Sequence, residues 1–150
     1  MSNIETLSET KPFAFIVALD PNGWALMKRD LDLIKKVLLA VQARTDLAPR
    51  PVSVEGYDEV IVARHVQMLF KTGFLEGAEK QSGRSYAPIV MVTDLSWSGH
   101  EFLAALENEN IWAKIKNSFS SDELAKMPLE ALKAAAIGLA TMLAKQRLGL

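Results

Sequence analysis

The sequence predicts an α+β fold, a winged helix-turn-helix-like domain with a C-terminal helical extension. Three observations indicate it: an amphipathic helix that ends at Thr72 and Gly73, two strand-like segments separated by a polar tip, and a helix opened by Ser96 with Gly99 three positions on. Helix, hairpin and helix in this order are typical of a winged helix, in which the hairpin is the wing.

Composition limits the classes of protein that the chain can belong to. Its 150 residues fit one domain with a sizeable core, and 49% hydrophobic with 23% charged residues indicate a globular chain. The absence of cysteine removes disulfides and thiolate sites. A formal net charge of −1 disfavours a strongly basic nucleic-acid binder. The apolar run 13–19 is too short to cross a membrane and lacks the flanks of a secretory signal, so we expect a cytoplasmic protein.

The first helix is predicted over residues 27–44. Asp46 and the segment Pro-Arg-Pro at 49–51 are predicted to end it, because proline has no N–H group to donate a hydrogen bond within a helix. Residues 52–54 are predicted to form a brief strand. The apolar positions of the helix recur at spacings of four and three: Met27, Leu31, Ile34, Leu38 and Val41.

A second helix is predicted from Asp58, its N-cap, to Gly73, which leaves it in the left-handed conformation. Its core face and its outward face follow from helical periodicity. The core face carries Val62, Val66 and Leu69. The outward face carries Val60, Arg64, Gln67 and Lys71.

The hairpin and the later helices complete the expected domain. Strands are predicted from Phe74 and over 87–93, with the polar tip at 79–85. Helices are expected around 102–106 and 111–119, and a last helix from Pro128 to residue 147, closed by Gly149. Small residues at 134–136 and at Gly138 permit close helix approach. They predict either a homodimer through this helix or packing on the first helix of the same chain.

Residues 1–26 precede the predicted domain, which spans residues 27–150. Their apolar segment 13–19 is compatible with an added strand that turns at Asp20 and Pro21. It is equally compatible with a loosely attached extension before a true start at Met27.

The residues expected to contact nucleic acid are Arg64, Gln67, Lys71, Lys80 and Arg84. Arginine and glutamine match the edges of guanine and adenine, and lysine matches phosphate. The residues at 80 and 84 occupy the predicted wing tip, from which wings contact the backbone. The alternative for these residues is an ordinary solvated helix face and a polar hairpin loop.

No catalytic, metal or cofactor site is predicted, and we expect no enzyme. His65 flanks the core stripe and is predicted to be a partly buried structural residue. His100 lies near Asp94 and Ser98, but closeness in sequence is not the geometry of a catalytic triad. Two histidines also offer too few zinc ligands. Trp97 and Trp112 are predicted core aromatics, with ligand stacking as the alternative.

The segments 62–77 and 95–103 resemble winged-helix regulators. More broadly, residues 27–150 resemble a bacterial and prophage-borne family known as a domain of unknown function, through MKRDLDLIKKVLL, GYDEVIVARHVQMLFKTGFLEG, LSWSGHEFLAALENENIWAKIK and PLEALKAAA. The resemblance implies a cytoplasmic winged-helix-like protein and transfers no catalytic residues. Residues 1–26 depart from it, since members typically begin at the position of Met27.

Together these observations predict a prophage or bacterial DNA-binding regulator whose partner is double-stranded DNA. The alternative is a small phage-type interaction module, an adaptor or an inhibitor of a host system, whose partner is a host or phage protein. Near-neutral charge favours the alternative, because a protein partner requires no attraction to phosphate.

Overall fold

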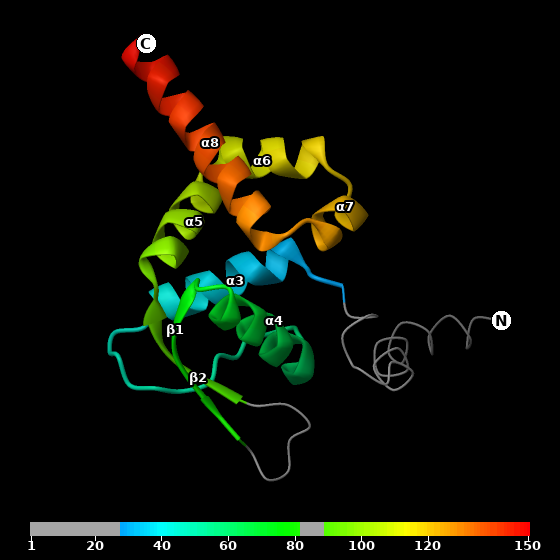
Figure 1. Ribbon diagram of the computed structural model, residues 1–150, viewed down its shortest axis with the longest axis vertical. Helices are drawn as coiled ribbons and strands as arrows, with labels where there is room; N and C mark the ends of the chain where they lie inside the picture. Colours follow the sequence, from blue (N-terminus) through cyan, green and yellow to red (C-terminus); the bar gives the residue numbers. More distant parts are fainter. Residues whose placement is uncertain (1–27, 82–88) are drawn as a thin grey trace, which may run out of the picture.

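The computed structural model describes residues 28–81 and 89–150. The segment 13–19 and Arg84 lie outside the described residues. Within them the chain forms helices and a two-stranded sheet, in the order α3 (Leu31–Gln42), α4 (Glu59–Lys71), β1 (Leu75–Lys80), β2 (Ile89–Leu95), α5 (Trp97–Glu107), α6 (Glu109–Ser118), α7 (Ser121–Lys126) and α8 (Leu129–Leu148). The α+β class is confirmed, and the arrangement is consistent with a small winged-helix-like domain (Figure 1).

Helix α3 is the central helix of the core. It begins later than the apolar pattern predicts, because the Asp30 carboxylate caps it by accepting hydrogen bonds from the backbone N–H groups of Asp32 and Leu33. Leu33, Val37 and Leu38 have no exposed surface. The helix packs against α4, α5 and β2.

Helix α4 has the predicted ends. The Asp58 side chain accepts from the N–H of Val60, and Gly73 follows the helix with φ of 87°. This left-handed conformation is the one that glycine adopts without steric cost. It turns the chain directly into β1, so that α4 and the sheet lie side by side (Figure 1).

The predicted hairpin is confirmed. Strands β1 and β2 are antiparallel, with Leu75 opposite Leu95 and Lys80 opposite Ile89. The predicted strand at 52–54 is wrong: the backbone of the segment after α3 pairs with the sheet at Arg50, which exchanges two backbone hydrogen bonds with Val92 (3.2 and 2.9 Å). The next residue is proline, whose missing N–H prevents continuation of the ladder.

The remaining helices cover the other side of α3. Phe74 and Phe102 pack with ring centroids 5.2 Å apart, and α5 is also in contact with α6 and α8. Helix α7 was not predicted, although Ser120 and Glu123 form a capping box that is visible in the sequence. Helix α8 ends at Leu148, one residue beyond the prediction, and Gly149 closes it with φ of 73°, as predicted. Among the described residues, no helix is both long and apolar enough to cross a bilayer.

Candidate functional site

The outward face of α4 is smaller than its periodicity predicts. Val60 is 53% exposed and Lys71 is exposed, whereas Arg64 is half-buried. Gln67 is only 4% exposed, so the prediction that it projects into solvent is wrong. The cause is the wing itself, since β1 packs along this side of α4.

Glu79 of β1 closes the surface between α4 and the hairpin. Its carboxylate accepts a long hydrogen bond from Gln67 Nε2 (3.4 Å) and lies 3.8 Å from Lys71 Nζ. Two of the five predicted nucleic-acid contacts are thus brought together, but around an acidic residue that sequence reasoning did not single out. An anion approaching Lys71 would have to displace this carboxylate.

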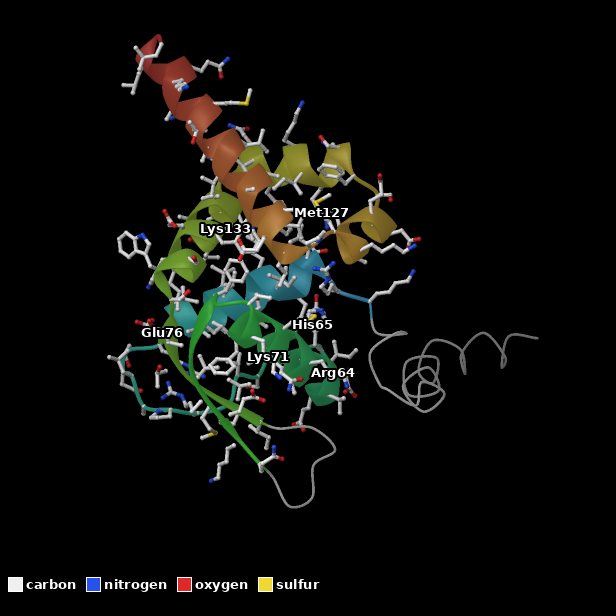
Figure 2. The ribbon with its side chains drawn as sticks, viewed as in Figure 1. Arg64, His65, Lys71, Glu76, Met127 and Lys133 are labelled. Atoms are coloured by element: carbon white, nitrogen blue, oxygen red, sulfur yellow. The ribbon has the colours of Figure 1, made fainter. Side chains whose placement is uncertain are left out.

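Of the other predicted contacts, Arg64 is one helical turn before Gln67 on α4, and Lys80 follows Glu79 in β1. Lys80 is exposed at the last position of β1, opposite Ile89. Arg84 lies in the segment 82–88, outside the described residues. Figure 2 places Arg64 and Lys71 on α4, with Lys71 nearer the end that leads into the hairpin.

Acidic residues open α4. Asp58 is the N-cap and Glu59 is the first helical residue, and both are exposed. They suit the positive end of the helix dipole. A recognition helix, however, commonly directs its N-terminal residues at base edges. In that arrangement Asp58 and Glu59 would enter a groove that is bordered by phosphates, and their negative charges would repel the phosphates.

His65 is a structural residue, as predicted, and is fully buried. Its Nε2 accepts a hydrogen bond from the N–H of Asp30 (2.9 Å), and its Nδ1 donates to the carbonyl of Ile61 (2.8 Å). This pattern is that of a neutral ring with the proton on Nδ1. Burial lowers the pKa of His65 below its usual value, and the bond to Ile61 opposes that shift only in part.

Trp97 contradicts its predicted place in the core. Its side chain is 80% exposed, the largest exposure of a described aromatic residue. Helical periodicity explains the position, because Trp97 lies on the face of α5 opposite Phe102 and Leu106, which are fully buried. The same periodicity was available in the sequence. Trp112 is half-buried beneath Lys35 Nζ, which lies 4.3 Å from the ring centroid.

Acidic residues surround the base of the hairpin next to Trp97. Glu76 and Asp94 are direct partners across β1 and β2. Glu101 is one helical turn after Trp97, and its exposed carboxylate lies 3.8 Å from Lys133 Nζ. Like charges directly opposite each other destabilise a sheet. We call Glu76, Asp94, Trp97 and Glu101 the Trp97 surface.

His100 belongs to the same turn of α5 but forms no triad. Its Nε2 lies 4.0 Å from Asp94 Oδ1. Ser98 Oγ accepts a hydrogen bond from Lys133 Nζ (3.0 Å), so the hydroxyl is engaged with α8 rather than with the histidine. The three residues that are close in sequence are therefore not arranged as nucleophile, base and acid.

Comparisons with known proteins identify relatives. The family model DUF2513, described as a hypothetical protein, matches residues 28–124. An uncharacterized protein of Haemophilus influenzae (strain ATCC 51907 / DSM 11121 / KW20 / Rd) is 30% identical over 109 residues, which are 71% of this chain and 90% of the relative. No solved structure matches the chain significantly.

Proposed function

The chain belongs to the DUF2513 family, and from that premise we propose that it is a small protein-interaction module, an adaptor or inhibitor built on a winged-helix-like scaffold. The observation that carries the proposal is the exposure of Trp97. A protein that buries a tryptophan only on binding has a large, rigid anchor at its surface, and tryptophan is among the residues most enriched in binding hot spots.

The scaffold holds Trp97 in one place. Ser96 caps α5 by accepting from the N–H of Gly99 (3.0 Å), and its own hydroxyl donates to the carbonyl of Gly73. The turn that carries the indole is therefore fixed to the end of α4 and to the start of the sheet. A fixed anchor loses little conformational entropy when it is buried by a partner.

The charges of the Trp97 surface indicate the chemistry of the partner. Glu76 and Asp94 lie at the base of the hairpin that leads into α5, and Glu101 follows Trp97 by one helical turn, so three acidic residues accompany an exposed indole, whose face attracts cations. A protein segment that carries arginine or lysine beside an apolar side chain complements both features. Glu76 and Asp94 occupy opposite positions in the two strands, where like charges are unfavourable, and a bound cation would offset this arrangement.

DNA binding is a second candidate function, and one observation favours it. Helix α4, which carries Arg64 and Lys71 (Figure 2), lies beside the hairpin, and Lys80 is exposed at the end of β1. Against it stand the acidic start of α4 and the carboxylate of Glu79 beside Lys71. Phosphate contacts dominate the affinity of proteins for DNA, so this balance of charge favours a protein partner.

The test is recovery of partners from the native host by full-length tagged protein. We expect a stoichiometric protein that the Trp97→Ala variant loses by about tenfold or more, as for a hot spot of about 2 kcal/mol. The matched control is Val60→Ala, which removes another exposed apolar side chain on a different helix. It should retain the partner.

Two results would contradict the proposal. One is recovery of the same protein at the same level with Trp97→Ala. The other is recovery of DNA alone, with its loss in the double variant Arg64→Ala/Lys71→Ala at low salt. The second result would establish the DNA-binding function in its place.

A further inference from the structure

The second half of α8 extends beyond the body of the protein. Figure 1 shows the C-terminal turns of α8 projecting past α5 and α6. The buried residues of the helix, Leu129, Leu132 and Ala136, all lie in its first half. Met142 is 66% exposed and Leu148 is 73% exposed. The chain thus exposes apolar side chains on a helix of 20 residues.

The middle of α8 has the composition of a buried helix. Residues 134–144 read AAAIGLATMLA and contain no charged residue on any side. A solvated helix face normally carries charged and polar residues, and a helix that is apolar all round is normally buried. Packing on α5 and α6 covers one side only. The described residues do not cover the outward side, which includes Gly138 and Met142.

We propose that a second copy of this chain covers it, through an antiparallel pairing of the two α8 helices that crosses at Gly138. The inference is independent of the partner proposed for the Trp97 surface. A twofold axis at Gly138 places the uncharged segment of one copy against the same segment of the other. A Cβ added at Gly138 meets no atom within 4 Å in the isolated chain, so this crossing point is open.

The charges at the two ends of α8 select the antiparallel direction. Glu130 lies eight residues before Gly138, and Lys145 and Arg147 lie seven and nine residues after it. In the antiparallel pair, Glu130 of one copy is therefore close to Lys145 of the other, whereas Arg147 lies on the side of the helix opposite Gly138 and takes no part in the contact. A parallel pair would place like charges side by side at both ends. The charge pattern is self-complementary only in the first arrangement.

An apolar hollow at the start of α8 accommodates the far end of the second copy. Its volume is about 440 Å³, and it lies between the C-terminal turn of α4 and the first turn of α8. Met68 and Leu129 are among its lining residues. In the register that crosses at Gly138, Leu148 of the second copy lies beside residue 128, at the edge of this hollow.

The hollow matters because the helix pair alone is small. A 20-residue helix is about 30 Å long and about 10 Å across, so the two helices bury roughly 300 Å² each. Roughly 600 Å² in total is below the about 1,200 Å² of a stable specific interface. Seating Leu148 of each copy in the hollow of the other adds two further apolar contacts. We therefore expect a reversible dimer rather than an obligate one.

Disulfide crosslinking tests the geometry, and the cysteine-free sequence makes it clean. The antiparallel pair predicts that Gly138→Cys forms a covalent dimer on mild oxidation. It also predicts that Ala131→Cys alone does not, and that a mixture of Ala131→Cys and Lys145→Cys chains gives the mixed dimer. Efficient crosslinking of Ala131→Cys with itself would overturn the antiparallel direction.

Sedimentation of the full chain over a range of concentrations tests the dimer itself. Met142→Glu should raise the dissociation constant by about tenfold or more, because the dimer would bury a carboxylate without a partner. Leu47→Glu is the matched control, since Leu47 is 67% exposed in the loop after α3. It should dimerise normally. A monomeric wild-type chain at every concentration, or equal loss of dimer in both variants, would refute the proposal.

Discussion

His65 connects the two central helices at the scale of a single residue. Its ring accepts from the N–H of Asp30, the residue that caps α3, and donates to the carbonyl of Ile61 in α4. The bond from Asp30 requires the neutral ring, because a protonated Nε2 cannot accept it, and the side chain has no exposed surface. Protonation would place a charge in the core and remove the acceptor of the bond from Asp30.

The pH dependence of stability follows from the lowered pKa of His65. Below its usual value of 6.5 the unfolded chain binds a proton that the folded chain resists, so the unfolded state gains stability. The stabilising contribution is complete above about pH 6.5 and declines as the pH falls toward the folded pKa. Urea unfolding from pH 7.5 to 5 should show this decline, and His65→Gln should remove most of it.

The carboxylates with lowered pKa values do not account for a slope in this range of pH. The lowered pKa values of Asp46 and Asp122 act only in more acid solution, below the usual value of 3.8. A slope between pH 6.5 and 5 that survives in His65→Gln would contradict this assignment.

At the scale of elements, α5 approaches the end of α4 so closely that Gly99 has no room for a side chain. A Cβ at this position would collide with the backbone carbonyl of Phe74, which is too rigid to move away. Gly138 of α8 is the opposite case, since nothing lies within 4 Å of the added atom. The two helical glycines thus differ: a side chain at Gly99 is excluded by a close backbone contact, whereas a side chain at Gly138 has space in the isolated chain.

Alanine substitution should separate these two glycines. We expect Gly99→Ala to lower the free energy of unfolding by about 1–3 kcal/mol through overpacking. Gly138→Ala should raise it by about 0.5–1 kcal/mol in dilute monomer, because the unfolded chain loses conformational freedom. Chemical denaturation at low protein concentration measures both. Equal destabilisation by the two substitutions would show that α8 is constrained at Gly138 within the monomer.

At the scale of the whole molecule, charge and apolar surface are unevenly distributed. Acidic residues gather at the Trp97 surface, Glu79 adjoins Lys71 between α4 and β1, and α8 extends an uncharged segment away from both. The protein therefore presents two separate surfaces. One surface suits a cationic protein segment, and the other suits a second copy of the chain.

Self-association through α8 should also appear in thermal unfolding. Because a dimer is stabilised by mass action, the midpoint temperature of the wild-type chain should rise with protein concentration. The midpoint of Met142→Glu should depend less on concentration than that of the wild-type chain. Trp97→Ala should change the free energy of unfolding by no more than about 0.5 kcal/mol, since its side chain packs against little. A concentration-independent midpoint in the wild-type chain would count against the dimer.

The sequence by itself determined the class of the fold and the ends of its main elements. Asp58, Gly73 and Gly149 act locally, through a cap or a left-handed residue, and the structure confirms each of them. The paired segments that flank the polar tip were likewise evident from their composition. Such features are readable because their physical causes lie within a few residues of the chain.

Only the tertiary structure decided which surfaces are available. Gln67 faces outward by periodicity but is covered by β1, and Glu79 is placed beside Lys71 by the same contact. The segment that follows α3 forms one isolated bridge, between Arg50 and Val92, and the position of this bridge depends on where the segment meets β2. Exposure depends on which elements pack together across long distances in the chain, and helical periodicity in one segment carries no information about its neighbours.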